Sequence, residues 1–428
     1  GLVLKNNKKK FKVMRESIWG LYDGLYFHDD FFVDQNVIKE DDVIFFSRGR
    51  NPGGCREKAL QDVKKSKYSS FIMGKLPVSI NVLLFRIIPK HIVRTGLLLA
   101  GFITAKDFSL IMAVHGVFSH QALHYEGVFS NFDIGCELGH SYFAADHIAQ
   151  SIICNNHGAK YYLIQWADNS LYSNRCILSA LGCDALFIWG KIHVSGEERN
   201  IPELVPTGYP FKRFVLDSST RKDEILKKIG ADPEKKVVSF FDESFGGDCR
   251  MTEVHYVRFW QAALICAQKD RSVTVLIKQK ASIEHQRLSP EIRAAFDPIL
   301  DIIKKTPNIV LVDNKIWSFI EVIGASDVVV TQGMTSTSGI AIVCGKQGLY
   351  LDETNYDHPF KRMYKDKIVF SDCETLVNMI YNIIYKRFDV FDILPDELKS
   401  QYDNFNDDRG VNLIRDYIAG RRELKGAN

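Results

Sequence analysis

Short apolar runs alternate with longer segments of helical periodicity along most of the chain, and this pattern constrains the fold most strongly. The apolar runs lie at 43–46, 71–73, 109–114, 160–165, 185–189, 236–241, 273–277, 308–312, 327–330, 348–351 and 368–370. Short runs of this kind are typical of strands buried on both faces of a parallel sheet. Helical segments between them, such as 174–181, 255–268 and 289–305, supply the crossovers that parallel strands require. The sequence therefore predicts an α/β protein.

The alternation stops near residues 206–236 and then starts again. Pro206–Pro210 is a turn cluster, and polar residues follow it. The chain has 428 residues, enough for two or three domains of ordinary size. We predict a first Rossmann-like domain over 1–215, a second over 216–405, and a C-terminal helix over 406–428 that packs on the first domain or on a membrane surface.

Composition argues against several classes of protein. Charged residues make up 25% and hydrophobic residues 46% of the chain, which is typical of globular domains and not of disordered or collagen-like chains. The net charge of +3 does not indicate a nucleic-acid partner. Charged residues interrupt the longest apolar stretch, at 76–118, which argues against a membrane-spanning helix.

The nine cysteines form no C-x-x-C pair, and several lie within apolar runs, as Cys154 and Cys344 do. Such cysteines behave as small buried hydrophobic residues, which favours a reducing compartment and argues against a structural zinc site. Residues 1–10 are charged and are not followed by an apolar segment, which predicts no signal peptide. We therefore expect a cytoplasmic location.

The strongest candidate site follows the apolar run at 327–330. Its polar and glycine residues are Gln332, Gly333, Thr335, Ser336, Thr337 and Ser338. Four consecutive hydroxyl residues open a helical segment here, and a helix N-terminus presents free N–H groups and a positive dipole end to an anion. A simple N-cap is the alternative, but it needs only one such residue. The segment predicts a phosphate site.

Two charged pairs follow other strands of the same half. Asp242 and Glu243 come directly after the run at 236–241, and carboxylates at such a position suit nucleophilic or general-base work at a sugar centre. Lys278 and Lys280 end another strand and suit a phosphate or a carboxylate. The alternatives are a capping aspartate and an ordinary solvated strand end.

Polar residues also follow the strand predicted at 160–165. Asp168 is a further candidate catalytic carboxylate. Gln165 and Asn169 are candidate ligands of a sugar that would act as the acceptor of a transferred group. His115 and His120 join them as candidate acceptor ligands from a histidine-rich stretch upstream.

Metal binding is the alternative for these histidines. His120 and His124 stand four residues apart, but the segment between them lacks the glutamate of the H-E-x-x-H pattern. We expect no metal and no cofactor, and we expect these histidines to hydrogen-bond a sugar or the protein interior.

The loop after the strand at 348–351 contains Asp352 and His358. Its place beside the hydroxyl-rich helix suggests contact with the ribose, base or sugar of a donor. An ordinary surface loop is the alternative.

Basic residues recur among apolar ones in three stretches. They are Lys8, Lys9 and Lys10; Arg86, Lys90 and Arg94; and Arg415, Arg421, Arg422 and Lys425. Basic amphipathic segments can lie on anionic lipid, although a solvated helix face is the commoner outcome. Peripheral contact with the inner face of the cytoplasmic membrane is therefore a hypothesis.

The order of these features resembles that of GT-B glycosyltransferases of bacterial surface-polysaccharide assembly. The resemblance covers about residues 105–370, and it rests on Gln165, on Ile188–Gly190 with Val205–Pro210, and on the acidic, basic and hydroxyl motifs. Those last three motifs are similar to the motifs of transferases that use CMP-activated sugars. The most similar group is the β-Kdo transferases of capsule and O-antigen synthesis, where Kdo is 3-deoxy-manno-octulosonic acid. Bacterial sialyltransferases are more distant, because they have His-Pro where this chain has Lys278–Lys280.

The resemblance implies a fold, an activity and roles for individual residues. It implies two Rossmann-like domains facing each other across a cleft, with a C-terminal helix that crosses back. The hydroxyl residues 335–338 would hold the phosphate of CMP, and Lys278 and Lys280 would meet this phosphate or the sugar carboxylate. Asp242 would be the carboxylate at the anomeric centre, acting as a nucleophile in a retaining transfer of Kdo to a glycan acceptor.

Two alternatives stay open. Transferases and epimerases that use CDP-glycerol or UDP-sugars share this fold and a hydroxyl-rich phosphate helix. A non-catalytic glycan- or nucleotide-binding partner of an assembly complex is the alternative from another class, and the acidic pair argues against it.

Overall fold

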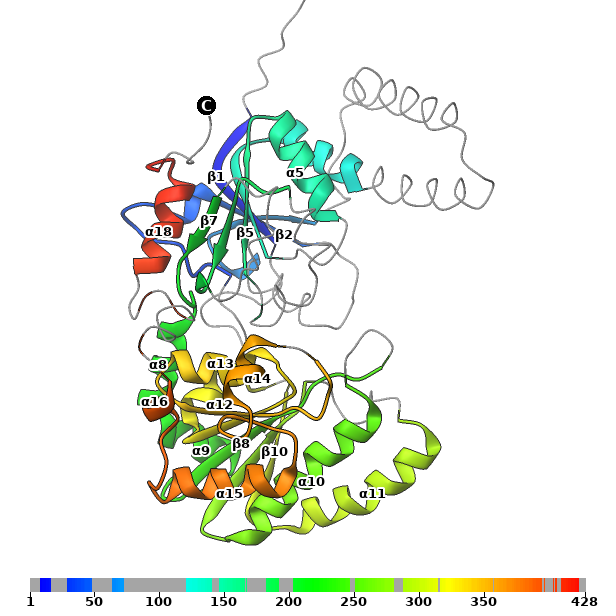
Figure 1. Ribbon diagram of the computed structural model, residues 1–428. Coiled ribbons are helices and arrows are strands. Elements are labelled where there is room, and N and C mark those ends of the chain that lie inside the picture. The colour runs from blue at the N-terminus through cyan, green and yellow to red at the C-terminus, as the bar shows by residue number, and fades with distance from the viewer. Residues whose placement is uncertain are drawn as a thin grey trace, which may run out of the picture.

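The computed structural model contains two β-sheets, one in each half of the chain (Figure 1). Every pairing between neighbouring strands in both sheets is parallel. The structure describes residues 8–16, 29–47, 64–72, 121–140, 146–165, 167, 182–191, 203–246, 251–280, 288–314, 316–356, 358–394, 396, 403, 405 and 409–422. Within these residues the α/β prediction is confirmed.

The N-terminal sheet has seven strands in the order β3-β2-β1-β4-β5-β6-β7. They are β1 (Lys9–Glu16), β2 (Val43–Ser47), β3 (Ser69–Ile72), β4 (Phe132–Gly139), β5 (Lys160–Ile164), β6 (Ala185–Ile188) and β7 (Glu203–Pro206). A 3-10 turn, η1 (Glu40–Asp42), precedes β2, and helix α5 (Asp146–Asn156) connects β4 to β5. The strand predicted at 109–114 and the helix predicted at 174–181 lie outside the described residues.

The C-terminal sheet has six strands in the order β10-β9-β8-β11-β12-β13. They are β8 (Lys236–Phe241), β9 (Val273–Lys278), β10 (Ile309–Val312), β11 (Val328–Gln332), β12 (Gln347–Leu351) and β13 (Val369–Phe370). The helices of this half are α8 (Lys212–Thr220), α9 (Lys222–Ile229), α10 (Glu253–Lys269), α11 (Pro290–Lys305), α12 (Phe319–Ala325), α13 (Ser336–Val343), α14 (Pro359–Tyr364), α15 (Cys373–Ile384) and α16 (Val390–Ile393). All its strands were predicted from the apolar runs.

The sequence did not predict β1 and β4, which pair at the middle of the N-terminal sheet. Their apolar runs are broken by charged residues that the fold buries, among them Arg15 in β1 and Glu137 in β4. Arg15 is tolerated there because Asp29 pairs with it at 3.4 Å and the rings of Phe31 and Phe32 lie beside it. Such long-range compensation is not visible in the local pattern.

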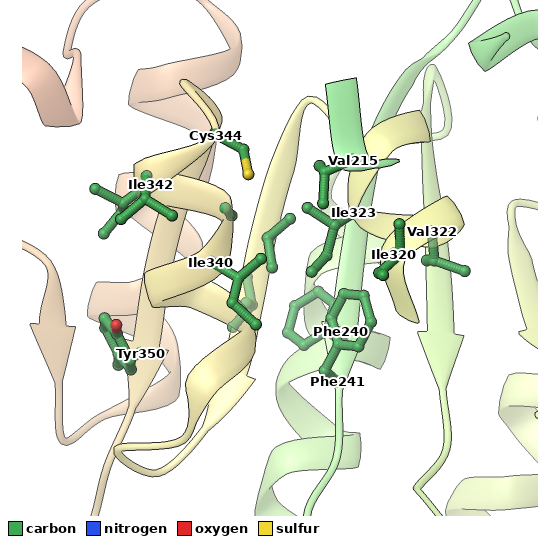
Figure 2. Close-up of a cluster of buried hydrophobic side chains, with 14 of the residues drawn as sticks. Val215, Phe240, Phe241, Ile320, Val322, Ile323, Ile340, Ile342, Cys344 and Tyr350 are labelled. Carbon is green, nitrogen blue, oxygen red and sulfur yellow. The ribbon is translucent and has the colours of Figure 1, made fainter. Parts of the chain in front are cut away.

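Branched and aromatic side chains from several elements form the core of the C-terminal half. Figure 2 shows Val215 of α8, Ile323 of α12 and Ile340 of α13 gathered around β8, whose Phe240 is fully buried. Helix α8 packs so closely on α12 that a Cβ at Gly324 would lie 2.5 Å from the Cβ of Ser218. Since α8 belongs to this half, the predicted boundary between residues 215 and 216 falls inside a helix.

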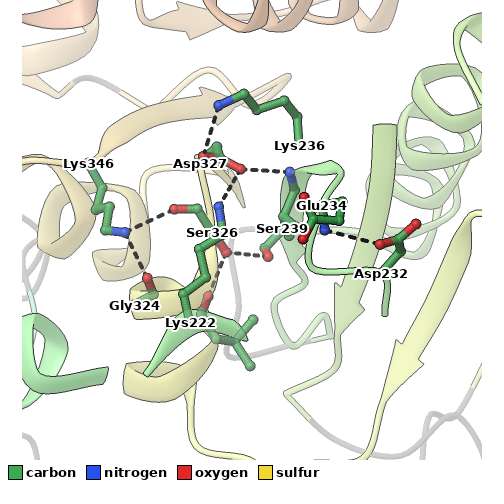
Figure 3. A network of polar contacts seen from close by, with 11 residues as sticks. Lys222, Asp232, Glu234, Lys236, Ser239, Gly324, Ser326, Asp327 and Lys346 are labelled. Carbon is green, nitrogen blue, oxygen red and sulfur yellow. Dashed lines mark hydrogen bonds and ion pairs between the residues drawn. The ribbon is translucent and has the colours of Figure 1, made fainter. Parts of the chain in front are cut away.

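Charged residues close the amino end of the C-terminal sheet (Figure 3). Asp327 precedes β11, and its Oδ2 accepts hydrogen bonds of 2.8 Å from Lys222 Nζ and from the backbone of Val237. Lys346 precedes β12 and donates to the carbonyl of Gly324 at 2.7 Å. These groups satisfy one another, so the amino end of the sheet is structural.

The C-terminal helix α18 (Arg409–Ile418) returns to the N-terminal sheet, as predicted. The ring of Tyr417 meets Phe187 of β6 at 5.4 Å, and Arg415 donates to the carbonyl of Phe32 at 2.9 Å. Figure 1 shows α18 beside this sheet. The buried Ile414, Tyr417 and Ile418 are therefore covered by protein and are not an apolar face for lipid.

The returning chain also contacts the linker between the two sheets. Asp403 is buried, and it accepts hydrogen bonds from the backbone of Tyr209 at 2.9 Å and from Lys212 at 3.1 Å. Gly208 has φ of +71°, and a Cβ there would lie 2.4 Å from Asp403. The two crossings between the halves are thus bonded to each other.

Within the described residues, no helix combines the length and the apolar character that crossing a bilayer requires.

Candidate functional site

Charged and polar side chains converge at the carboxyl ends of three adjacent strands of the C-terminal sheet. Asp242 and Glu243 follow β8, Lys278 ends β9 with Lys280 two residues on, and Gln332 ends β11. β8 lies between β9 and β11, and Phe241 of β8 pairs in register with Lys278 and with Thr331. Ligands of open parallel sheets bind at this edge. The sheet therefore brings the predicted acidic and basic motifs into contact.

Asp242 is held from the neighbouring strand end. The N–H of Lys280 donates to Asp242 Oδ1 at 2.6 Å, and the Asp242 N–H donates to the carbonyl of Lys278 at 3.3 Å. The side chain is only 6% exposed. Its Oδ2 and the nearby hydroxyl of Tyr256 are buried without a well-formed hydrogen bond in the described part of the chain. One carboxylate oxygen is thus fixed by the backbone, and the hydroxyl of Tyr256 lies beside the carboxyl group.

Burial raises the pKa of Asp242 to about 7, because desolvation penalises the charged form. The hydrogen bond from Lys280 acts against this rise, as do Tyr256 and the charge of Lys278, whereas the charge of Glu243 adds to it. A carboxyl group with a pKa near neutral can accept or release a proton at physiological pH, and its ionised form is more nucleophilic than that of an ordinary aspartate.

Glu243 connects all three strand ends. Its Oε1 forms an ion pair with Lys280 Nζ and accepts a hydrogen bond from the Ser244 N–H at 2.8 Å. Its own N–H donates to Oε1 of Gln332 at 3.0 Å. Gln332 is almost fully buried, and its Nε2 has no hydrogen-bond partner within the described residues. Glu243 and Lys280 were predicted to serve catalysis and the donor, and here they hold each other.

The hydroxyl-rich segment opens α13 directly after β11, as the sequence predicted. Thr335 is the residue before the helix and makes no side-chain cap, while its hydroxyl donates to the carbonyl of Gln332 at 3.3 Å. Deeper in the helix, Thr337 bonds to the hydroxyl of Thr331, and Ser338 donates to the carbonyl of Leu349 at 2.5 Å. The hydroxyls of Thr337 and Ser338 therefore help to pack α13 on β11 and β12.

Gly333 makes the turn between β11 and α13. Its φ is +64°, and a Cβ there would lie 1.6 Å from the side chain of Met251. The left-handed backbone at this position disfavours residues with a Cβ, whereas the close atom is the flexible end of Met251. The glycine is therefore explained by the turn, and the donor contact predicted for it stays a prediction.

The two predicted donor ligands after β12 are engaged within their own loop. Buried Asp352 pairs with Lys361 at 2.8 Å and accepts a hydrogen bond from the hydroxyl of Thr354 at 2.6 Å. His358 caps α14, with its Nδ1 accepting from the N–H of Phe360 at 3.1 Å. These contacts shape the loop beside α13, and direct donor contact by either residue stays a prediction.

The N-terminal half offers less of the predicted acceptor site. Gln165 follows β5, but its amide ties the sheet together: Oε1 accepts from the Trp189 N–H at 2.8 Å, and Nε2 donates to the carbonyl of Ala167 at 3.2 Å. The other predicted residues of this site lie outside the described residues; they are His115, His120, Asp168 and Asn169.

Sequence reasoning missed a buried charged group at the carboxyl end of β1. Arg15 pairs with Asp29, and neighbouring Asp30 accepts a hydrogen bond from the hydroxyl of Tyr68 at 3.2 Å. Burial raises the pKa of Asp30, and the hydrogen bond from Tyr68 and the charge of Arg15 oppose this rise. The aspartates lie far from any predicted strand, so the apolar pattern could not have found them.

In the part of the chain that the structure describes, no three side chains of His, Cys, Asp or Glu lie close enough to hold a metal ion.

No protein-family model matches this chain, and no curated protein matches its sequence. Solved structures match along almost its whole length. A UDP-GlcNAc 2-epimerase from Neisseria meningitidis bound to UDP-GlcNAc has a TM-score of 0.53 at 12% identity, covering 96% of this chain and 100% of that chain. The S. aureus MnaA–UDP structure has a TM-score of 0.52 at 11% identity, covering 96% of each chain. The wall teichoic acid polymerase TagF, in a variant soaked with CDPG, has a TM-score of 0.51 at 10% identity, covering 96% of this chain and 88% of that chain.

The chain has the GT-B fold. At these identities the similarity concerns the fold alone. The GT-B part of the resemblance is thereby confirmed, and chemistry must be argued from the site.

Proposed function

We propose that this chain is a glycosyltransferase that moves Kdo from CMP-Kdo to a glycan acceptor in lipopolysaccharide, O-antigen or capsule synthesis. The observation that carries the proposal is the contact between Asp242 and the Lys278–Lys280 strand end on the donor half of a GT-B fold. It brings a candidate nucleophile, through backbone hydrogen bonds, beside a strand end that has two lysines, and an anionic donor needs such positive charge. The motif order of CMP-sugar transferases supports the donor assignment.

The geometry is compatible with retention through a covalent intermediate. Ionised Asp242 would attack the anomeric carbon of Kdo through Oδ2, and the bond to the CMP oxygen would break with its electron pair going to CMP. The acceptor hydroxyl would then displace Asp242 from the same carbon and lose its proton to a base. The N-terminus of α13, with Thr335 and Ser336 at its start, would bind the phosphate, and the charge of buried Lys278, whose Nζ bonds to the carbonyl of Gln279, would favour it electrostatically. A monophosphate leaving group of this kind needs no metal in the proposal.

A different donor is the second candidate, and the matched structures favour it. TagF was soaked with CDPG, and the two other proteins were solved with UDP or UDP-GlcNAc. A CMP-sialic acid, CDP-glycerol or UDP-sugar donor would use the same strand ends and the same helix. A non-catalytic nucleotide- or glycan-binding role is the alternative from another class, and the burial that raises the pKa of Asp242 would be present in either case.

We also propose that the acceptor is a glycan linked to a lipid. The protein would then act in the cytoplasm, at the inner face of the membrane that holds this lipid. Lys8, Lys9, Lys10, Arg421 and Arg422 are exposed. Because the apolar face of α18 is covered, contact with anionic lipid would be electrostatic, without insertion of this helix.

Calorimetric titration and a turnover assay test the proposal together. We expect CMP to bind more tightly than CDP or UDP, and CMP-Kdo to be consumed only when a glycan acceptor is present. Tight UDP binding without CMP binding would transfer the proposal to the second candidate. Nucleotide binding without turnover of any donor on a set of glycan acceptors would favour the non-catalytic role.

A further inference from the structure

Lys280 makes two contacts at the carboxyl edge, one through its backbone and one through its side chain. Its N–H holds Asp242 Oδ1 at 2.6 Å, and its Nζ pairs with Glu243. The Lys280 side chain is 54% exposed and that of Glu243 is 20% exposed. The ammonium group is therefore within reach of a ligand, although a carboxylate of the protein already occupies it.

Hydrogen bonds hold Glu243 in this position. The Ser244 N–H donates to the same Oε1 that meets Lys280, and the amide of Gln332 accepts from the Glu243 N–H. Gln332 is buried, so it cannot follow a mobile surface loop. These bonds fix a carboxylate beside the cation at the end of β8, and the pair is a defined feature of the sheet edge.

The chemistry of the proposed donor explains why a carboxylate should stand there. In a 2-keto sugar acid such as Kdo, the carboxylate is attached to the anomeric carbon itself. If Asp242 reaches that carbon, the sugar carboxylate must lie next to Asp242. Lys280 is the exposed cation whose backbone touches Asp242, whereas Lys278 is buried and donates to the carbonyl of Gln279 at 3.1 Å.

We propose that Glu243 occupies the place of the donor's sugar carboxylate on Lys280, and that this carboxylate displaces Glu243 when the donor binds. The inference rests on the proposed function and names the residue that reads the sugar. Exchange of one carboxylate for another on the same ammonium group keeps the number of ion pairs constant. A neutral hexose has no group to replace Glu243, so its donor would leave the pair closed. Glu243 and Lys280 would thus select donors with a carboxylate at the anomeric carbon.

Glu243→Gln distinguishes binding of the sugar carboxylate from binding of the nucleotide. The amide keeps the size of the side chain and removes the competing charge. Because a partly exposed ion pair contributes up to about 1 kcal/mol, we expect the KM for CMP-Kdo to fall by about threefold to fivefold. The inhibition constant of CMP, which lacks the carboxylate, should change by less than about twofold on the same grounds. Steady-state kinetics with CMP as a competing product give both values.

Lys280→Gln tests the cation while the backbone N–H that holds Asp242 is retained. We expect its KM for CMP-Kdo to rise about tenfold or more, as for loss of a charge-assisted contact, with little change in CMP inhibition. Thermal unfolding of both variants checks that the fold is intact.

Glu353→Gln is the matched control. Glu353 follows β12 at the same sheet edge and pairs with Arg258 at 2.8 Å, so this variant removes the same charge from another ion pair. We expect KM and CMP inhibition to stay within about twofold of the wild type. The charge of Glu243 helps to raise the pKa of Asp242, among the effects of burial, Lys278, Tyr256 and the Lys280 amide. The acidic limb of the kcat profile should therefore move to lower pH in Glu243→Gln and stay in place in Glu353→Gln.

Two results would overturn the inference and leave the proposed function standing. One is an equal change for CMP and CMP-Kdo in Glu243→Gln or Lys280→Gln, and the other is the same gain in Glu353→Gln. If the wild-type protein neither consumes CMP-Kdo nor is inhibited by CMP, the proposed function itself fails.

Discussion

The polar residues at the carboxyl ends of the strands have different roles in the two sheets. At the C-terminal sheet, Asp242, Lys280 and Gln332 directly follow or end their strands, and buried polar atoms of Asp242 and Gln332 have no hydrogen-bond partner among the described residues. At the N-terminal sheet, Arg15 pairs with Asp29, and the amide of Gln165 bonds to the backbone on both sides. Arg15 Nε and Asp30 Oδ1 are also buried without a hydrogen-bond partner among the described residues, so the edges differ in their charges: the N-terminal edge buries an Arg15–Asp29 ion pair, whereas among the described residues no ion pair holds the buried carboxyl of Asp242.

This difference predicts which residues affect catalysis and which affect the stability of the fold. A buried polar group without a partner costs stability, and it is retained where it serves a ligand. Substitutions at the C-terminal edge should therefore lower turnover without lowering stability, and substitutions at the N-terminal edge should lower stability more than turnover. Four experiments test this contrast.

Asp242→Asn should give the largest effect. Loss of a nucleophilic carboxylate is expected to lower kcat by about a thousandfold or more, while CMP affinity changes by less than about threefold. Initial rates with CMP-Kdo and calorimetry with CMP measure the two quantities. Asp301→Asn, at an exposed position of α11, is the control and should retain full activity. Near-normal kcat in Asp242→Asn would remove this residue from the chemistry.

Asp29→Asn should act on folding. Because it leaves the buried guanidinium of Arg15 without its anion, we expect the free energy of unfolding to fall by about 3 kcal/mol or more. Urea unfolding followed by circular dichroism measures this loss. The double variant Arg15→Met with Asp29→Leu should recover much of it. Unchanged stability in Asp29→Asn, with strongly reduced turnover, would reverse the contrast between the two edges.

The pH dependence of stability should report the burial of Asp242. Its folded pKa of about 7 lies above the unfolded value of about 3.9, so the unfolded state binds fewer protons between these values. Ionised Asp242 therefore destabilises the fold progressively as pH rises from 4 to 7. Asn at this position should gain up to about 4 kcal/mol over the wild type at pH 8 and little at pH 4. A pH-independent difference would contradict the raised pKa.

The serines of α13 should give the smallest effects. They should distinguish residues that pack the helix from residues that bind the phosphate. Ser338→Ala removes a buried hydrogen bond to Leu349 and should cost about 1 kcal/mol of unfolding free energy, with CMP affinity unchanged. Ser336→Ala, in the first turn of the helix, should weaken CMP binding by about threefold to tenfold with little effect on stability. Chemical denaturation and calorimetry on both variants decide the assignment, and the opposite pattern would overturn it.

Much of the C-terminal site could be predicted because its residues end or follow strands that are largely apolar. The run ending at Phe241 predicts both β8 and the position of Asp242, and the same holds for β9 with Lys278. The N-terminal sheet was harder, since buried charges interrupt β1 and β4 and make them look like surface segments. Their neutralising partners, such as Asp29 for Arg15, come from loops that carry no periodic signal.

The sequence alone determined the α/β class, the restart of the pattern between two sheets, and which strand ends carry acidic, basic and hydroxyl residues. These follow from periodicity, which is local. The tertiary structure decided how those residues are used. Parallel pairing of β8 with β9 places Lys280 beside Asp242 and Glu243, and the packing of α13 on β12 directs the hydroxyl of Ser338 to the carbonyl of Leu349. It also buries Asp242, and desolvation then raises its pKa. Distance and burial are properties of the packed sheet, and they convert a list of polar residues into a site.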